Sequence, residues 1–570
     1  MPPATGTAGT RAAHARPPAA AAWPLRPGVV IAIAAALGLA LRALALTRPG
    51  YLTGFTQYDD GVYIGNSLRL VSGVIPYRDF AMVQPPGVML LMVPAALAGK
   101  ALGSMWALAA ARVLTVGADT ANVVLLGLLV RHRGPLAAGV ACGGYAVYPA
   151  ALAASQSVFL EPWLNLFCLL GALVLFRGDR LAGQPDTGRA DTGRADTGQP
   201  DTGRADTGPG ASARGSGWAL WAGVCFGFAA AVKIWAVVPA LVAFALCLRA
   251  RRGRLPFAAG FVAGLAVPCL PFEILAPGGF GRTVFLSELV QATHGRIPAA
   301  PRFADITGIT GLGSVGISPR LRIGLLAAFL ILVFLAAAWI RARRSGVRAA
   351  PLDWFAWFAL AAVAVMMFTP SEWYEHYAAF AGTFLLLALG LSAAWLLAPG
   401  PRSSSGAAPW FRVAAAAAAL AIAAVAVIDG HSVTKLYPGT DLAQAKALIP
   451  PGACVLTDTV SATIVIDRFT SPAPGCPALV DAVGTLIATT DGQDLYGPPS
   501  VSARDTQAWQ TAFEHAQYVW LYGNRGYTGA RIIWTSSLHA YFVHHFRLIG
   551  LRSSFGGSKL VPGGGLYVRT

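Results

Sequence analysis

Residues 29–46 read VVIAIAAALGLALRALAL, an apolar run in which Arg42 is the one charged residue. Similar runs recur as far as Ile428, and about 20 apolar residues are what a helix needs to cross a hydrocarbon layer about 30 Å thick. The composition agrees, because 55% of the 570 residues are hydrophobic and only 12% are charged. An ordinary soluble domain carries about 25% charged residues. The sequence therefore predicts a polytopic α-helical membrane protein.

The apolar runs predict about eleven spans by their length. The segment Gly87–Gly103 is apolar too, but it follows Pro85-Pro86, and we predict a re-entrant or interfacial helix there and do not count it. An odd number of spans places the two ends of the chain on opposite sides of the membrane. The spans are predicted near 29–46, 106–130, 135–153, 162–177, 218–233, 234–249, 255–272, 321–340, 353–369, 378–398 and 410–428.

The net charge of +17 comes from short basic clusters, and these predict the orientation. Lys and Arg form no stripe with interleaved aromatic residues, so the charge does not indicate nucleic-acid binding. Each cluster falls where an alternating count of spans predicts cytoplasm, as the positive-inside rule requires. We expect a plasma-membrane protein with a cytoplasmic N-terminus and an extracytoplasmic C-terminus. The clusters are Arg131/Arg133, Arg177/Arg180, Arg249–Arg254 and Arg341–Arg348.

Three segments flank or interrupt the predicted membrane domain at 28–428. Residues 1–27 are rich in Ala and Pro and contain no acidic residue, so we expect a disordered cytoplasmic N-terminus. The loop at 178–217 contains a repeated pentapeptide of the type ADTGR, which lacks large apolar residues and predicts a disordered cytoplasmic linker. From 429 to 570 the hydropathy drops, and short alternating runs between helix-like stretches predict a small extracytoplasmic α/β domain.

The seven cysteines show no paired spacing typical of a zinc or iron–sulfur site. Five of them lie in or beside apolar runs, where we expect them to pack between helices. Cys454 and Cys476 lie in the polar C-terminal region, and a disulfide between them would stabilise the fold by about 3 kcal/mol in an oxidising compartment. We predict this disulfide, which agrees with an extracytoplasmic C-terminal domain.

The most informative polar stretch is Tyr58-Asp59-Asp60-Gly61-Val62-Tyr63, directly after the first span. It leads into an amphipathic segment, then into GVIPYRDF at 73–80 and QPPG at 84–87. Two interpretations are open from the spacing alone. Asp59 can cap a helix while Asp60 complements the positive end of that helix, or the two carboxylates can belong to a reaction site.

Three further polar residues are predicted at or near the outer ends of spans. Lys233 ends the span at 218–233, either as a cation that reaches the interface or as a phosphate ligand. Arg112 lies about two turns inside its span, where we expect it to face a cavity or a carboxylate such as Asp119. Glu161 opens the span at 162–177, where it complements the helix dipole or belongs to the site.

The order of these motifs resembles the membrane glycosyltransferases of the GT-C superfamily. The resemblance is greatest to the protein O-mannosyltransferase and aminoarabinose-transferase type, and to the actinobacterial mannosyl- and arabinosyltransferases that use polyprenyl-phosphate sugars. It extends over residues 29–400 in the order of apolar runs. It is sharp only around 59–87, 159–162 and 372–377, where His376-Tyr377 is similar to an element near the donor site of bacterial members.

The resemblance implies transfer of mannose or another hexose or pentose from a polyprenyl phosphate to a hydroxyl of an envelope glycan, lipid or protein on the outer face. The catalytic acid falls on Asp60 or Asp59, and a carboxylate there would act as general base toward the acceptor hydroxyl. The second carboxylate would bind a divalent metal ion or orient the sugar or acceptor. Contacts to donor phosphate or substrate fall on Lys233, His376, Tyr377, Arg112, Glu161 and Tyr63.

Two other functions remain open. A transporter or flippase of a lipid-linked saccharide would show ionisable residues near span midpoints and inverted repeats, whereas the acids here gather mostly in outer loops. A non-catalytic envelope-assembly protein would bind glycan through its C-terminal domain. The sequence contains no phosphate-binding loop, dinucleotide fingerprint or H-E-x-x-H motif.

Overall fold

The structure of the chain is a computed structural model. The N-terminal residues 1–24, the repeat-containing loop at 182–208 and most of 398–439 lie outside the described residues. The disorder predicted for the loop at 178–217 is wrong at its two ends, where Arg180–Leu181 form a strand and a helix begins at Pro209. The structure describes residues 25–178, 180–181, 209–250, 253–286, 299–309, 317–370, 373–397, 420, 424, 440–490, 503–521, 532–551 and 562–570.

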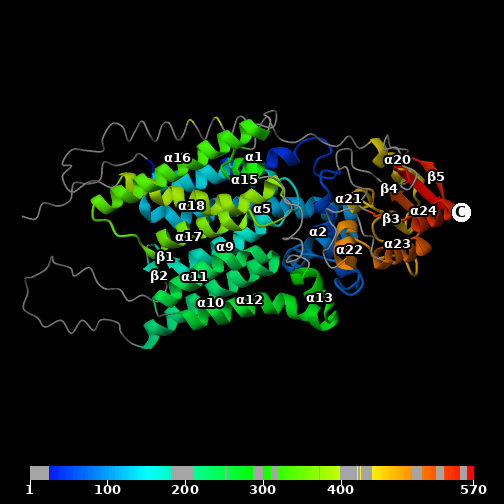
Figure 1. Cartoon of the computed structure of the whole chain (residues 1–570), viewed down its shortest axis with the longest axis horizontal. Coiled ribbons are helices and arrows are strands. Elements are labelled where there is room, and N and C mark those ends of the chain that lie inside the picture. The colour runs from blue at the N-terminus through cyan, green and yellow to red at the C-terminus, as the bar shows by residue number, and fades with distance from the viewer. Residues whose placement is uncertain are drawn as a thin grey trace, which may run out of the picture.

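Long apolar helices lie side by side in a bundle that forms most of the molecule (Figure 1). Glycine, alanine and large aliphatic residues dominate these helices, which favours close helix packing in a lipid environment. The bundle comprises α1 (Pro27–Leu46), α5 (Ser104–Val130), α6 (Pro135–Ala138), α7 (Gly144–Ala146), α8 (Pro149–Ser155), α9 (Glu161–Leu175), α10 (Pro209–Val232), α11 (Val237–Arg249), α12 (Arg254–Leu275), α16 (Ile317–Arg344), α17 (Pro351–Met366) and α18 (Ala378–Leu397).

The predicted spans from 29–46 to 378–398 coincide with these helices, and 410–428 lies almost entirely outside the described residues. Among the described residues, five helices are long and apolar enough to cross a membrane, or six if one bent pair counts as a single span. That pair occupies the span predicted near 135–153. It bends by 51° before α8, because Pro149 has no N–H to continue the hydrogen-bond ladder. The number eleven stays a prediction.

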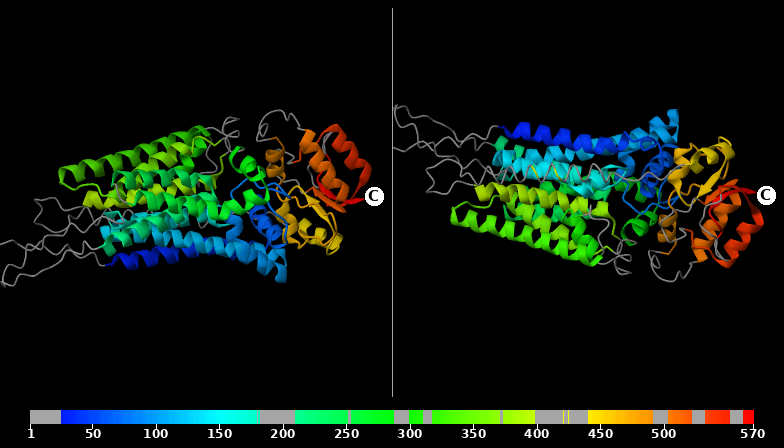
Figure 2. Two further views of the ribbon diagram at one scale, coloured as in Figure 1. Left: turned by 90° about the horizontal axis from the view of Figure 1, so that it is seen from below. Right: turned by 90° about the horizontal axis from the view of Figure 1, so that it is seen from above.

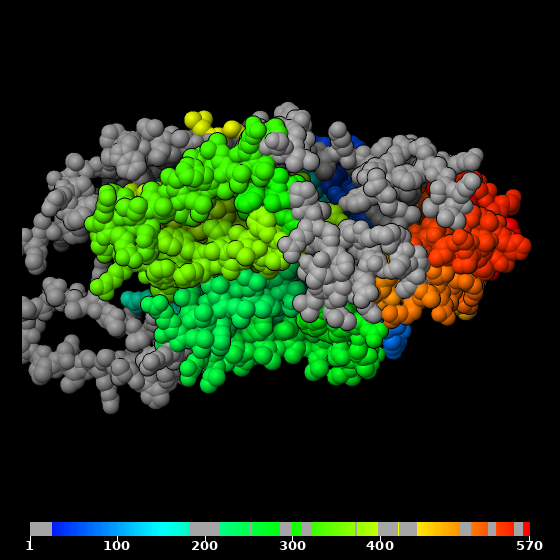
Figure 3. Space-filling view, viewed as in Figure 1, coloured from blue at the N-terminus to red at the C-terminus, as the bar shows by residue number. Residues whose placement is uncertain are grey.

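Apolar side chains cover the outer face of the bundle. Leu326, Phe329, Leu330 and Leu332 of α16 are 56–64% exposed, and this helix lies along the surface in Figure 3. A soluble protein rarely exposes so large an apolar stripe, whereas a lipid-facing helix does so by necessity.

Helices α10 and α12 pack through a reciprocal pair of glycine motifs. A Cβ added at Gly223 or Gly227 would lie 2.1 Å from the carbonyl oxygen of Phe257 or Phe261. Gly260 and Gly264 of α12 meet backbone carbonyls of α10 just as closely. Small residues four apart let two helix backbones approach within a distance that larger side chains prevent.

One end of the bundle carries the segments that precede and flank the candidate site. Helix α2 (Tyr58–Val71) is followed by the predicted interfacial segment, which forms two short helices, α3 (Gly87–Leu91) and α4 (Val93–Leu102), in place of one continuous span. The same region contains α13 (Gly279–Gly281), a π-helical turn (Arg282–Leu286), α15 (Ala299–Ile306) and short 3-10 turns at Ile234–Ala236 and Glu375–Tyr377.

The C-terminal part contains a four-stranded sheet in the order β3-β4-β6-β5. Strand β3 (Val455–Thr457) is parallel to β4 (Tyr518–Leu521), and the pairs of β6 (Gly565–Arg569) with β4 and with β5 (Phe546–Gly550) are antiparallel. Cys454 and Cys476 are joined by a disulfide beside this sheet. The accompanying helices are α20 (Thr440–Leu448), α21 (Val460–Val465), α22 (Ala482–Thr490), α23 (Ala503–His515) and α24 (Ser536–His545).

This C-terminal part lies against the end of the bundle formed by α2, as the views in Figures 1 and 2 agree. Val460, Ile464 and Val465 of α21 belong to the same buried apolar cluster as the bundle helices. The interface is therefore part of the protein core and is not a loose contact between two bodies.

The opposite end of the bundle carries basic residues. The short hairpin of β1 (Phe176–Arg177) and β2 (Arg180–Leu181) lies there, far from the C-terminus (Figure 1). Arg177 stacks over the ring of Trp218 at 3.7 Å, and Arg133 pairs with Asp353 at 2.9 Å. The acidic α2 and these arginines thus occupy opposite ends of the molecule.

Candidate active site

Asp60 lies on the first turn of α2, has no solvent-exposed surface, and forms an ion pair with Arg112 of α5. Oδ2 of Asp60 also accepts hydrogen bonds from the hydroxyls of Thr56 at 2.9 Å and Ser157 at 2.8 Å. A buried carboxylate whose oxygens already accept from an arginine and two hydroxyl groups has little acceptor capacity left for a substrate hydroxyl. The geometry therefore favours a structural role for Asp60.

Arg112 faces a carboxylate, as predicted, but this is Asp60 and not Asp119, and its further contacts weaken its assignment to donor phosphate. Its Nη1 donates to the carbonyl oxygens of Tyr51, Leu52 and Gly54 at 2.6–2.9 Å. Arg112 thereby fixes the loop that leads into α2. Both Nη atoms already donate to acceptors inside the protein, which leaves them little donor capacity for a lipid phosphate.

Asp119 has a different partner, Arg42 of α1, whose Nε lies 2.7 Å away. Both side chains are fully buried, and Asp119 also accepts hydrogen bonds from Tyr145 at 2.7 Å and Asn122 at 3.1 Å. The pair joins α1 to α5 inside the bundle, and both charges have partners within the protein. It offers no accessible charge for ion-coupled transport.

Asp59, the neighbouring acid, is half-buried at the start of α2. Its charge acts on Tyr63, one helical turn later. Burial raises the pKa of Tyr63 well above its usual value, and the negative charges of Asp59, Glu161 and Asp481 raise it further. These four side chains therefore share one electrostatic environment, in which Tyr63 keeps its phenolic proton and remains a hydrogen-bond donor.

Glu161 connects the segment 159–162 to Lys233 and to the segment 375–377. It is the first residue of α9, and its Oε1 accepts a hydrogen bond from Nζ of Lys233 at 2.8 Å. Its Oε2 lies 4.0 Å from Nε2 of His376. Glu161 and Lys233 are 1% and 3% exposed, and a buried ion pair of this kind is stable only when its hydrogen-bonding groups are well placed.

Aromatic rings enclose Lys233. Its ammonium lies 3.4 Å from the ring centroid of Trp235 and 4.0 Å from that of Tyr377, both within the range of a cation–π contact. His376 stacks on Phe159 with a centroid distance of 4.0 Å. The segments 159–162 and 375–377, which are far apart in the sequence, thus meet around one cation.

The predicted residues fall into two neighbouring groups. Asp60 and Arg112 form a closed pair under the first turn of α2. Around Tyr63 lie the charges of Asp59 and Glu161, and Glu161 connects them to the remaining residues of the candidate site, which are Lys233, His376 and Tyr377.

Sequence reasoning missed the polar residues that surround Asp60 and Tyr58. Thr56 and Ser157 bond to Asp60, Ser461 approaches its Oδ1 at 3.1 Å, and Tyr58 donates to Asp481 at 2.5 Å. No sequence signal identifies Ser461 or Asp481, because they lie some 400 residues from α2 in a part with a different composition.

A divalent metal ion was one of the roles predicted for the acidic pair. Across the part of the chain that the structure describes, no three His, Cys, Asp or Glu side chains lie close enough together to hold a metal ion. Asp60 already uses its carboxylate on Arg112 and hydroxyl groups. The residues present do not fit a metal site, and we derive no step through one.

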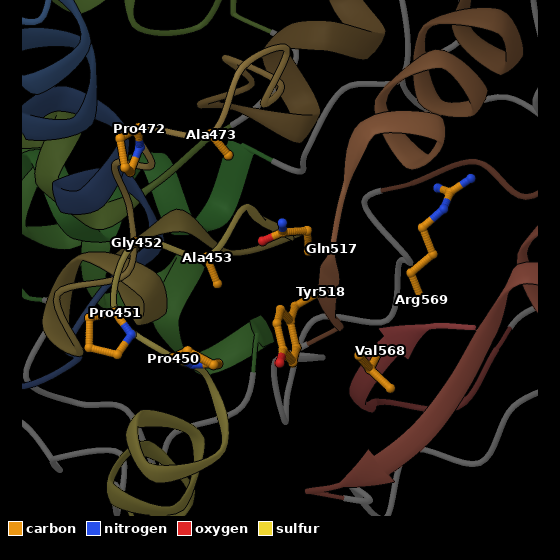
Figure 4. A pocket seen from close by; sticks show the side chains of 10 residues that line it. All are labelled: Pro450, Pro451, Gly452, Ala453, Pro472, Ala473, Gln517, Tyr518, Val568 and Arg569. Atoms are coloured by element: carbon orange, nitrogen blue, oxygen red, sulfur yellow. The ribbon is translucent and has the colours of Figure 1, made fainter.

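A separate cleft of about 570 Å³ lies in the C-terminal part (Figure 4). It contains none of the predicted site residues, and the side chain of Arg569, which borders it, is already bonded to the carbonyl of Phe513 at 2.6 Å. The cleft is lined by Pro450, Pro451, Gly452, Ala453, Pro472, Ala473, Gln517, Tyr518, Val568 and Arg569.

No protein-family model matches the chain, and no curated protein matches its sequence. Among solved structures, ArnT from Cupriavidus metallidurans bound to undecaprenyl phosphate is 15% identical, with a TM-score of 0.46 over 77% of this chain and 84% of that protein. The Archaeoglobus fulgidus oligosaccharyltransferase AglB with an inhibitory peptide and a dolichol-phosphate is 14% identical, with a TM-score of 0.48 over 87% and 69%.

The arabinofuranosyltransferase AftD from Mycobacteria is 16% identical, with a TM-score of 0.40 over 94% of this chain and 41% of AftD. These three proteins are membrane glycosyltransferases of the GT-C superfamily. Because the identities are 14–16% and the TM-scores 0.40–0.48, we derive the function from this chain's own side chains.

Proposed function

We propose that this protein is a GT-C membrane glycosyltransferase that moves a sugar from a polyprenyl phosphate to a hydroxyl group of the cell envelope. One observation carries the proposal. Ser157 bonds to Asp60 at 2.8 Å and so brings the segment that carries Glu161 beside the turn that carries Asp59, while Glu161 holds Lys233 at 2.8 Å beside His376. A proton acceptor and a cation suited to phosphate, Lys233, thus lie near one another at the end of an apolar bundle, which is what this reaction requires.

Asp59 is the general base of the proposed reaction. The acceptor hydroxyl attacks the anomeric carbon, its proton passes to the Asp59 carboxylate, and the bond between the anomeric carbon and the phosphate oxygen breaks. The electron pair leaves with the polyprenyl phosphate, and the configuration at the anomeric carbon inverts. We assign this role to Asp59 and not Asp60, because Asp60 is buried in four polar contacts.

Lys233 and His376 bind the donor phosphate. The ammonium of Lys233 can share its remaining N–H groups with a phosphate oxygen while Glu161 keeps it in place. Charge on the departing phosphate grows during the reaction, so a preplaced cation in a water-poor site stabilises the transition state more than the ground state. Tyr377, Trp235 and Phe159 exclude water from this contact.

The orientation follows from the charge distribution. The arginine-bearing end of the bundle faces the cytoplasm under the positive-inside rule, so α2 and the C-terminal part face outward. The disulfide in the C-terminal part suits an oxidising compartment. Mannose is the first sugar to test, and the acceptor is an envelope glycan, lipid or protein.

The test compares two matched variants of the purified full-length protein, Asp59→Asn and Asp79→Asn. Asp79 lies in the same outer region and pairs with Arg78 at the surface. We expect Asp59→Asn to lower kcat about 10²–10⁴-fold, the usual contribution of a general base. Asp79→Asn should retain near-normal sugar transfer, and full activity of Asp59→Asn would refute the assignment.

A further inference from the structure

We propose that the C-terminal part completes the reaction site, with Ser461 and Asp481 as positioning residues that hold the acid-bearing turn of α2. This inference rests on the proposed function, since it assigns these residues to the transfer reaction. It differs from an acceptor-binding role for the C-terminal part, because it assigns both residues to holding α2 and not to binding substrate.

Ser461 lies on α21 and points into the first turn of α2. Its hydroxyl oxygen lies 2.8 Å from the carbonyl oxygen of Gln57, 2.9 Å from that of Tyr58 and 3.1 Å from Oδ1 of Asp60. One hydroxyl proton is thus offered to three acceptors at the start of the helix. Ser461 has no exposed surface, so no water competes with its hydroxyl for these acceptors.

Asp481 forms the second contact with the same turn. Its Oδ1 accepts the hydroxyl proton of Tyr58 at 2.5 Å, and the Tyr58 oxygen in turn accepts a hydrogen bond from the backbone N–H of Ala482 at 3.1 Å. Asp481 also accepts from the N–H of Val483 at 3.0 Å, which ties the contact to the start of α22. Tyr58 is therefore held at its carbonyl and at its phenol by the C-terminal part.

Two glycines of α2 explain how α21 comes so close. A Cβ added at Gly61 would lie 2.2 Å from Oγ of Ser461 and 2.5 Å from its backbone. A Cβ at Gly65 would lie 3.1 Å from Val480 and 3.2 Å from Phe469. Gly61 and Gly65 are four residues apart and share a helix face, so they form the surface on which the C-terminal part docks.

A further contact ties the same element to the bundle. Oδ1 of Asp467, just after α21, accepts hydrogen bonds from the backbone N–H of Met105 at 2.9 Å and from the hydroxyl of Ser104 at 3.2 Å. Both donors lie in the first turn of α5, where N–H groups need partners. Helix α21 is thus anchored on α2 and on α5, the helix that carries Arg112.

Asp59 lies between Tyr58 and Asp60, which are both held in place. Tyr58 is held by Ser461 and Asp481, and Asp60 is held by Ser461 and Arg112. Rotation of the first turn would carry Asp59 away from the acceptor hydroxyl. A misplacement of about 1 Å can cost on the order of 10²-fold in rate, so loss of the Ser461 contact should lower kcat more than it changes KM.

The test uses Ser461→Ala in the full-length protein, with Ser471→Ala as its matched control. Ser471 contacts Gly452 and Ala473 inside the C-terminal part and does not touch α2. Hydrogen–deuterium exchange of residues 58–65 and steady-state sugar transfer are both measured. We expect Ser461→Ala to exchange several-fold faster at these amides and to lose about 10–100-fold in kcat, with donor KM changed less than about threefold.

The two readouts separate this inference from the proposed function. If wild type transfers sugar and Ser461→Ala matches it in exchange and kcat, the positioning role is refuted. Reduced transfer without faster exchange in α2 also refutes it. If wild type transfers no sugar from any donor while Ser461→Ala still exchanges faster, the proposed function fails and the contact to α2 stands. Tyr58→Phe, which removes only the hydroxyl that Asp481 accepts, gives a second test if Ser461→Ala does not fold.

Discussion

At Asp60, charge burial and charge pairing act against each other. Removing a carboxylate and a guanidinium from water is costly, and the pair persists because Thr56 and Ser157 supply further hydrogen bonds. The pair therefore contributes less to net stability than its geometry suggests. Removing one partner alone is different, because the other charge is then left buried.

Arg112→Met should accordingly lower the free energy of unfolding by about 3–5 kcal/mol, the usual cost of leaving one charge of a buried pair unpaired. Arg78→Met removes an arginine from an exposed ion pair with Asp79 and should cost less than about 1 kcal/mol. The unfolding of both variants in detergent is followed by tryptophan fluorescence. Equal stability of the two variants would contradict the structural role of Arg112.

The buried carboxyl group of Asp505 should make the stability of the C-terminal part depend on pH. Burial raises the pKa of this carboxyl to about 6, opposed by a hydrogen bond from Thr489. Its pKa in the unfolded chain is about 3.9, so between pH 4 and 6 the native state binds more protons than the unfolded state. The contribution of Asp505 to the free energy of unfolding should therefore be most favourable at or below pH 4. As the pH rises through 6, the free energy of unfolding should fall by at most about 3 kcal/mol.

Asp505→Asn should flatten this dependence, because its amide does not ionise. Thermal unfolding midpoints of wild type and variant are compared from pH 4 to pH 7. The variant should gain stability relative to wild type toward pH 7. A constant difference between the two proteins over the whole range would show that Asp505 does not titrate there.

At the scale of elements, glycines determine which helices approach closely. The α10–α12 contact requires glycine at four positions, because a Cβ there would meet a backbone carbonyl at 2.0–2.2 Å. We expect Gly227→Ala to separate the two helices and to destabilise the bundle by about 1–3 kcal/mol.

Gly217→Ala in the same helix is the control, because a Cβ there meets nothing within 4 Å. It should leave stability unchanged or raise it slightly, since alanine favours the helix. Thermal unfolding in one detergent measures both. A Gly227→Ala protein as stable as Gly217→Ala would mean that the two backbones are not in contact.

Local patterns predicted these elements better than they predicted side-chain partners. Apolar runs identified the long helices, because helix length in a membrane is set by bilayer thickness. Arg112 pairs with a carboxylate, as predicted, but the example given, Asp119, lies seven residues later in the same helix, whereas the actual partner Asp60 is 52 residues earlier. Pairing across helices depends on how they pack, and a single sequence does not contain that information in readable form.

At the scale of the whole molecule, the site is assembled from distant segments. Glu161 and Lys233 were predicted because each occurs where an apolar run begins or ends, whereas Asp59 and His376 were predicted from the resemblance of their motifs to those of GT-C glycosyltransferases. The contribution of the C-terminal part was not predictable, because Ser461 contacts Asp60 across a separation of 401 residues. Nothing in the local sequence around Ser461 distinguishes it from other buried serines.

Reduction of the disulfide tests whether the C-terminal part holds α2. Cys454 and Cys476 close a loop of 22 residues, and such a cross-link contributes about 3 kcal/mol. Reduction should lower the unfolding midpoint of the C-terminal part, and sugar transfer should fall in parallel if that part holds α2. A reduced protein with unchanged stability and unchanged exchange in α2 would contradict this coupling.

The activity proposed for this protein is transfer of a sugar from a polyprenyl phosphate. The most direct measurement incubates wild-type protein in proteoliposomes with radiolabelled polyprenyl-phosphate sugars, one donor at a time, together with an envelope fraction as acceptor. We predict that one donor loses its label to the acceptor and releases one polyprenyl phosphate per sugar transferred, and that Asp59→Asn slows both about 10²–10⁴-fold. Label that crosses the membrane while still bound to its lipid, or that stays on every donor, would contradict the account.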